Sequence, residues 1–183
     1  MFWYLKSSSL PVKIMKKALE ILNELKEKGL LGDYAIGGGI ATIFYTEPVF
    51  TYDLDVFVIV KPKPQGKIIS LAPIYDYLKS KGYVWEGEHI VIEDMPVQFI
   101  PAGTDLEKEA VENAKDITYS GARTKVVPAE YLIAIALRVG RRKDFEKVGR
   151  LFDQAKIDKN TLEKILKKHN LWEKFEKWKE KLK

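Results

Sequence analysis

The stretch YAIGGGIATIFYTEPVFTYDLDVFVIV, residues 34–60, sets three consecutive glycines ahead of an apolar run that opens with two aspartates one residue apart. Residues 53–60, DLDVFVIV, are β-branched, aromatic and nearly continuously apolar, which predicts a strand inside a sheet covered on both faces. Residues i and i+2 of a strand point to the same side, so Asp53 and Asp55 project together. Two carboxylates on one buried face repel each other unless a positive charge lies between them.

The two aspartates therefore predict a site for a divalent cation. Carboxylate oxygens suit Mg²⁺ or Mn²⁺, and such ions commonly take substrate phosphates as further ligands. Gly37, Gly38 and Gly39 turn a short strand at 34–36 into a helix over about 40–45. A glycine turn that opens a helix offers backbone N–H groups to phosphate with no Cβ in the way. Metal beside a phosphate cradle is typical of phosphoryl or nucleotidyl transfer.

Each motif by itself has a simpler interpretation. Asp-x-Asp can be a pair at the exposed end of a strand, and three glycines can form an ordinary turn. The order strand, glycines, short helix, then strand opening with Asp-x-Asp is more specific than either motif.

The remaining patterns predict an α/β (α+β) core over residues 1–125, followed by an all-helical extension over 126–183 packed on it as one structural unit. Residues 83–94 indicate a hairpin around 86–88, and residues 95–103 indicate a further strand. The predicted helices cover about 9–28, 40–45, 71–81, 104–115, 129–139, 144–155, 161–169 and 171–182. Residues 61–67 are predicted as a loop, and short strands are expected at 117–119 and 125–127.

The composition excludes several classes of protein. The 183 residues contain no Cys and only two His, which excludes a disulfide framework and a thiolate metal site. No apolar run approaches the roughly 20 residues that span a bilayer, so we expect a cytoplasmic protein with no membrane partner. Abundant Lys and Glu with few Met are typical of a thermophile.

The net charge of +5 comes from the C-terminal end of the chain. Residues 156–183 hold ten Lys against five acidic residues, which leaves 21 basic and 21 acidic residues upstream. Such a tail is either a nucleic-acid footprint or a Lys-rich solvated helix face. Interleaved glutamates favour the solvated face.

This order of motifs resembles the minimal nucleotidyltransferase fold, in which a Gly-Gly turn and a short helix precede a strand opened by Asp-x-Asp. Here residues 40–52 separate Gly38-Gly39 from Asp53-Leu54-Asp55. More narrowly, the chain resembles the AbiEii-type nucleotidyltransferases, the toxin branch of type IV toxin–antitoxin and phage-abortive systems. That resemblance is carried by TYDLD at 51–55, VPAEYL at 127–132 and GRRKD at 140–144, and covers roughly residues 33–170.

The resemblance implies a nucleotidyltransferase-like mixed sheet flanked by helices, and a Mg²⁺- or Mn²⁺-dependent transfer of NMP from an NTP. It implies a macromolecular acceptor, RNA such as tRNA or a protein, and a toxin role with a cognate antitoxin. Asp53 and Asp55 are the implied catalytic residues and metal ligands, with Gln98 as a third ligand. The implied nucleotide-binding residues are Gly37, Gly38, Gly39, Thr51, Arg138, Arg141 and Lys143.

The chain also departs from the family pattern. Gln98 stands where the superfamily has a third carboxylate, and Glu93 or Asp94 are less suitable replacements because they fall in a predicted turn. Gly39 replaces a frequent Ser. In the AbiEii-type branch, Val49 stands in place of a frequent Arg, and Ala136 stands where a Lys is common. These changes support a second interpretation, a non-catalytic nucleotide-binding or protein-interaction module on the same fold.

Other conspicuous residues have a structural interpretation beside the functional one. Arg138, Arg141, Arg142 and Lys143 either contact phosphates or form a solvated helix end. Residues 172, 175 and 178 are aromatic at helical spacing, which favours a core-facing stripe over base stacking. His89 and His169 are expected to be structural or exposed. A third interpretation is a nucleic-acid binder that uses the basic tail.

Overall fold

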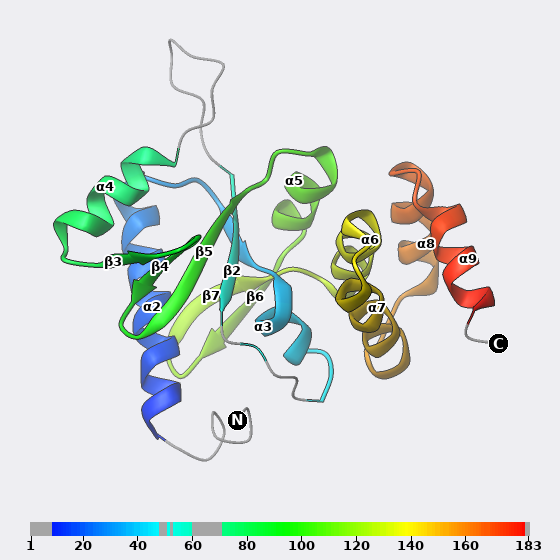
Figure 1. The fold of residues 1–183 in the computed structure, drawn as a ribbon, viewed down its shortest axis with the longest axis horizontal. Helices are drawn as coiled ribbons and strands as arrows, with labels where there is room; N and C mark the ends of the chain where they lie inside the picture. The colour runs from blue at the N-terminus through cyan, green and yellow to red at the C-terminus, as the bar shows by residue number, and fades with distance from the viewer. Residues whose placement is uncertain (1–8, 48–50, 52, 60–70, 182–183) are drawn as a thin grey trace, which may run out of the picture.

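The fold is a mixed seven-stranded sheet with helices on both faces, seen in a computed structural model that describes residues 9–47, 51, 53–59 and 71–181 (Figure 1). The strand order is β3-β4-β5-β2-β1-β7-β6. β1 pairs parallel with β7 and β2 pairs parallel with β5, while the other neighbours are antiparallel. The strands are β1 (Tyr34–Ile36), β2 (Leu54–Val58), β3 (Val84–Glu86), β4 (His89–Ile92), β5 (Met95–Pro101), β6 (Lys115–Tyr119) and β7 (Ala122–Val126).

The register of the central strands separates an apolar face from a polar one. Leu54 lies opposite Val97, which lies opposite Ile90, and all three side chains are fully buried. Because side chains alternate along a strand, the next residues on these strands face the other side. Asp55 and Gln98, which are opposite each other in the register, therefore share the polar face.

The apolar face is covered by α2 (Ser9–Glu27), which packs against β7, β4 and β5. Met15, Leu19, Leu22 and Leu25 repeat at helical spacing and are all buried there. The helix ends at Glu27, and Gly29 in the turn after it has a φ of 68°, the left-handed conformation common beyond a helix C-terminus. α4 (Ala72–Ser80) lies beside α2, where the Tyr77 hydroxyl donates to Glu24.

The opposite face carries α3 (Gly38–Ile43), against β2, and α5 (Asp105–Glu112), against β1 and β2. α5 begins with the predicted capping box, because Thr104 Oγ1 accepts from Glu107 N and the Glu107 carboxylate accepts from Thr104 N. These short helices leave part of the polar face near Asp55 uncovered by either of them.

The C-terminal helices join this face through α6 (Ala129–Val139), which contacts α3, α5, α7 and α8. α6 is buried almost all round. Figure 1 shows α6 and α7 (Arg142–Gln154) between the sheet and the pair α8 (Lys159–Lys168) and α9 (Trp172–Glu180). α6 therefore connects the sheet to the remaining helices.

The sequence located these elements well, with differences at their ends. The helix predicted over 40–45 begins two residues earlier, because Gly37 is extended and acts as the N-cap. The helix predicted over 144–155 begins at Arg142, because Asp144 accepts from the backbone N–H of Arg141. The helix predicted to reach residue 115 ends at Glu112, and Lys115 is instead the first residue of β6. The predicted loop at 61–67 and Val49 lie outside the described residues.

Leu137→Ala tests whether core and extension unfold as one unit. Leu137 is fully buried on α6, so the substitution should lower the free energy of unfolding by about 2–5 kcal/mol. Val139→Ala, on the same helix and half exposed, should change it by less than about 0.5 kcal/mol. Urea unfolding followed by circular dichroism and by tryptophan fluorescence should give coincident transitions. Two separated transitions would show that residues 126–183 unfold independently.

Candidate functional site

Asp53 and Asp55 lie where β2 begins, on the polar face of the sheet. The Thr51 hydroxyl donates to Asp53 Oδ1 at 3.0 Å and so orients that carboxylate, which is 40% exposed. Asp55 is also only partly exposed, and its carboxylate faces the glycine turn. The structure thus brings the two predicted metal ligands and Thr51 together.

The glycine turn lies directly against this end of β2. The Gly37 N–H donates to the Asp55 carbonyl oxygen at 2.9 Å. Gly38 has a φ of 57°, and a Cβ at that position would overlap the Asp55 carboxylate. A Cβ on Gly39 would lie 2.5 Å from Thr51 Oγ1, so this residue also needs the absence of a side chain.

The surroundings of Asp55 favour its protonated form. Burial and, after it, the neighbouring charge of Asp53 raise the pKa of the Asp55 carboxyl above its usual value. Lys147, His89 and Lys143 oppose this rise. A cation bound between the two carboxylates would oppose it more strongly, because it would act on both at short range.

The cations near Asp55 come from α7, the helix that follows α6. Lys143 and Lys147 lie one helical turn apart, and both favour the ionised form of Asp55. Lys147 was not identified from the sequence, although its spacing of four residues from Lys143 places both on one helix face. Arg141 is engaged by Asp144, which its guanidinium contacts at 2.8 and 3.3 Å.

The other predicted basic residues are placed differently. Arg142 is 95% exposed at its side chain and lies 3.3 Å from Glu146 on its own helix. Arg138 is exposed near the end of α6. Their contact with a nucleotide therefore stays a prediction, and the described contacts favour Lys143 and Lys147.

Gln98 lies on the strand next to β2, as the family resemblance implied, and the register of β2 and β5 sets it opposite Asp55. Its Nε2 donates to Glu88 Oε2 at 3.3 Å, in the turn between β3 and β4. Glu93 forms an ion pair of 2.6 Å with Lys17 of α2, the helix on the opposite face. Glu93 therefore does not supply the missing carboxylate, as its predicted turn position indicated.

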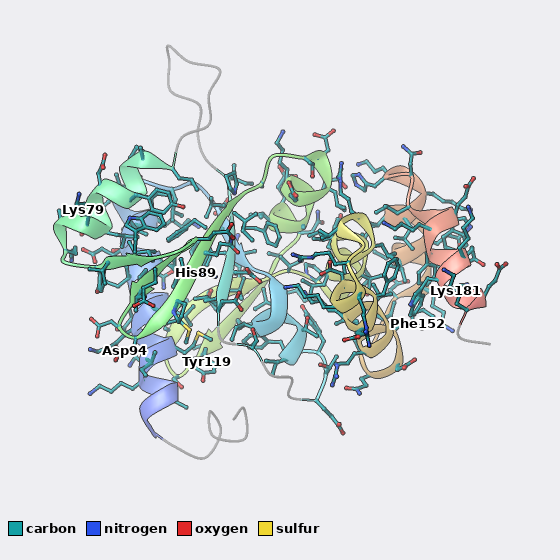
Figure 2. The ribbon with its side chains drawn as sticks, in the orientation of Figure 1. Lys79, His89, Asp94, Tyr119, Phe152 and Lys181 are labelled. Carbon is teal, nitrogen blue, oxygen red and sulfur yellow. The ribbon has the colours of Figure 1, made fainter. Side chains whose placement is uncertain are left out.

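His89 is the functional candidate that sequence reasoning missed. It begins β4, which β5 separates from β2, and Figure 2 labels it on the sheet. Its Nε2 lies 3.6 Å from Asp53 Oδ2. That nitrogen is buried, and the described part of the chain offers it no hydrogen-bond partner. No signal in the linear sequence joins the two residues, because their proximity depends on how β4, β5 and β2 are aligned.

These residues fit a divalent ion in an open site. Among the residues that the structure describes, no three His, Asp or Glu side chains already enclose a metal position. Mg²⁺ is commonly held by one or two carboxylates together with substrate phosphates, so a closed protein cage is not required. The paired carboxylates, the unpartnered His89 nitrogen and the glycine cradle at Gly38 meet that requirement.

The aromatic residues of the last helix belong to the core. Phe175 and Trp178 are buried, with ring centroids 5.5 and 6.0 Å from Phe152 of α7. This confirms the core-facing interpretation for these two residues. His169 is structural, with Nε2 3.1 Å from Glu109 Oε2 and a side chain only 9% exposed.

The basic tail is partly neutralised by ion pairs. Lys167, Lys168 and Lys179 pair with Glu163, Glu109 and Glu176, at 2.6–2.8 Å. This pattern fits the solvated helix face better than a dedicated nucleic-acid surface. No helix within the described ranges is long and apolar enough to cross a bilayer.

Comparison with known proteins identifies the fold. The sequence matches no protein-family model and no curated protein. Among solved structures, an antigenic nucleotidyltransferase-like protein from Paracoccidioides brasiliensis matches with a TM-score of 0.53 and 16% identity, over 77% of this chain and 76% of that one. ANT(2″)-Ia in complex with adenylyl-2″-tobramycin matches with a TM-score of 0.50 and 16% identity, over 85% of this chain and 94% of that one.

These likenesses show that the chain has a nucleotidyltransferase-like fold, as the resemblance of its glycine and aspartate motifs implied. The AbiEii-type branch is not among these similarities and stays a prediction.

Gly38→Ala should destabilise the protein more than Gly29→Ala does. Both glycines have positive φ, of 57° and 68°, but a Cβ on Gly29 meets nothing within 4 Å. Gly29→Ala should therefore cost only the backbone strain of about 1–2 kcal/mol. Gly38→Ala should cost at least about 1 kcal/mol more, because the methyl group displaces the Asp55 carboxylate. Urea unfolding measures both, and equal costs would contradict the close contact.

Asp55→Asn should stabilise the metal-free protein at neutral pH. The pKa of Asp55 is raised on folding, so the folded state binds more protons and stability falls as pH rises from about 3.9 through the raised pKa. Removing the buried charge should add roughly 0.5–2 kcal/mol at pH 7. Below about pH 3.5 the gain should disappear, because wild-type Asp55 is then protonated in both states.

The measurement is urea unfolding in EDTA at pH 7 and pH 3.5. The exposed Asp153→Asn is the surface control and should change stability by less than about 0.5 kcal/mol. A gain from Asp55→Asn that is equal at both pH values would mean that the charge of Asp55 is not its cause.

Proposed function

We propose that the protein is a nucleotidyltransferase that binds an NTP with Mg²⁺ or Mn²⁺ and transfers NMP to an acceptor. The observation that carries the proposal is the close approach of the Gly38 backbone to the Asp55 carboxylate, opposite the cationic face of α7. The contact supports the proposal because the backbone N–H groups that would bind phosphate lie close to a carboxylate that would hold a metal. The fold, shared with nucleotidyltransferase-like proteins, supports the same reaction class.

Each part of the site has a role in this reaction. Asp53 and Asp55 would hold the divalent ion, which neutralises phosphate charge when bound. Gly38 and Gly39 begin α3, so their N–H groups have no acceptor within that helix and can donate to phosphate oxygens. Lys143 and Lys147 would stabilise the negative charge that develops on the departing pyrophosphate.

The chemical step is a displacement at the α-phosphorus. A hydroxyl or phosphate oxygen of the acceptor forms the new bond to the α-phosphorus, and the bond from that phosphorus to the bridging oxygen breaks. Pyrophosphate leaves with the electron pair, and the acceptor's proton passes to solvent or to a nearby base. The protein contributes mainly positioning and charge neutralisation.

The acceptor class follows from family resemblance. We propose a macromolecular acceptor, RNA such as tRNA or a protein, and a toxin role that a cognate antitoxin would restrain. The fold relative ANT(2″)-Ia is seen with adenylyl-2″-tobramycin, so a small hydroxylated acceptor belongs in the same test.

A second candidate function is a non-catalytic nucleotide-binding module. It is favoured by one observation: the residue opposite Asp55 is the neutral Gln98, whose amide is engaged by Glu88. With two carboxylates rather than three, a second metal ion that activates the acceptor would bind less well.

Label transfer separates the two functions. Each of the four α-labelled NTPs is incubated with the protein, Mg²⁺ or Mn²⁺, and total RNA, cell protein or an aminoglycoside. We expect label on one acceptor class, and none with the Asp53→Ala/Asp55→Ala variant. NTP binding by folded wild type without any transfer would support the non-catalytic module.

Lys143→Ala and Lys147→Ala should each weaken NTP binding about tenfold or more. That factor corresponds to the loss of one charge-assisted hydrogen bond, worth about 1.5–3 kcal/mol. Arg142→Ala removes the same charge from the adjacent helix position, where the side chain is almost fully exposed. It should change the affinity less than twofold. Equal losses in all three variants, measured by calorimetry at 0.15 M salt, would indicate a diffuse charge effect instead.

A further inference from the structure

His89 shares the polar face of the sheet with the two aspartates. Ile90 lies opposite Val97, so the preceding residue on β4 comes beside Gln98, which lies opposite Asp55. Side-chain alternation then directs His89, Gln98 and Asp55 to the same side. These three residues form a row across β2, β5 and β4, and His89 at the outer end of the row lies near Asp53.

The distance between His89 Nε2 and Asp53 Oδ2 is 3.6 Å, which is too long for a hydrogen bond. It is close to the spacing of two atoms that ligate one ion. In the octahedral geometry that Mn²⁺ favours, bonds of about 2.1–2.2 Å place neighbouring donors roughly 3.0–3.1 Å apart, so the two atoms would move about 0.5 Å closer to bind one ion.

The environment of that nitrogen calls for a partner. His89 Nε2 is buried, and within the described residues it has no hydrogen-bond partner. A buried polar atom without a partner costs free energy, commonly about 1–3 kcal/mol. A bound cation would satisfy the nitrogen and neutralise Asp53 at the same time.

The position of Gln98 makes this nitrogen more important. The amide nitrogen of Gln98 donates a hydrogen bond to Glu88, and Gln98 carries no negative charge. The next residue on the same face that could ligate a metal is His89. The site thus has an imidazole near the place where a third carboxylate would be expected.

We propose that His89 ligates the divalent ion together with Asp53 and Asp55, and that the site therefore prefers Mn²⁺ or Co²⁺ to Mg²⁺. This inference rests on the proposed function, because it assumes the metal site of that reaction. Imidazole nitrogen binds first-row transition ions well, whereas Mg²⁺ favours oxygen ligands almost exclusively. A mixed nitrogen and oxygen site should therefore discriminate between ions that carboxylates alone bind more evenly.

The test is direct observation of the ligand in the Mn²⁺-loaded protein. Pulsed electron paramagnetic resonance should detect nitrogen coupling to the bound Mn²⁺ in the wild type. The coupling should be lost in His89→Ala, and Mn²⁺ affinity should fall at least about 10–100-fold, the range known for losing even an outer-shell partner. His169→Ala is the matched control, because His169 also faces a carboxylate but lies on the C-terminal helices. It should keep both the coupling and the affinity.

A second variant tests the same assignment by a change in metal preference and not by a loss of binding. His89→Asp would give three carboxylates, so it should raise the affinity for Mg²⁺ relative to Mn²⁺, measured by competition. Circular dichroism confirms that each variant is folded.

The failures are distinguishable. If Mn²⁺ binds the wild type and is lost in Asp53→Ala/Asp55→Ala, but shows no nitrogen coupling, the role of His89 is refuted and the metal site of the proposed function stands. If Mg²⁺ but not Mn²⁺ binds the folded wild type, the metal preference is refuted and the proposed function stands. If neither ion binds, with or without any of the four NTPs, both are refuted. Nitrogen coupling that persists in His89→Ala also overturns the assignment.

Discussion

The site depends on one close approach, that of the glycine turn to the first residues of β2. The Gly37 N–H bonds to the Asp55 carbonyl, and Gly38 lies so near the Asp55 carboxylate that no side chain fits between them. The contact fixes where α3 begins, how β1 and β2 are aligned and which way Asp55 faces. It is built entirely from backbone and one acidic side chain, so the residue types at these positions admit little change.

The same contact creates an electrostatic problem that the rest of the site answers. A buried carboxylate beside a second one is destabilising, and burial is the larger cause of the raised pKa of Asp55. Among the described residues, no ion pair involves Asp55. Its ionised form is favoured instead by Lys147 and Lys143 of α7 and by His89 of β4, whose buried Nε2 has no hydrogen-bond partner among those residues. A destabilising carboxylate of this kind is typical of a functional site.

The C-terminal helices are part of this arrangement. α6 is packed on nearly all sides and contacts α7, the helix from which Lys143 and Lys147 act on the charge of Asp55. The buried Asp144, paired with Arg141, fixes the start of α7 and so the direction of that helix. The helical extension thus completes the site that the sheet begins.

The sequence by itself determined the strand with Asp53 and Asp55, the glycine turn and the buried faces of the helices. These features are local or periodic, and alternation along a strand or a helix is enough to reveal them. The nucleotidyltransferase-like fold was expected from the resemblance of the motif order to that family, which also placed Gln98 at the third-ligand position on a neighbouring strand. Tertiary structure alone decided that Lys147 belongs to the site, that Glu93 pairs with the opposite face, and that His89 reaches Asp53. Those contacts depend on strand order, register and helix packing, which join residues 36 to 92 positions apart and leave no mark in the spacing of the chain.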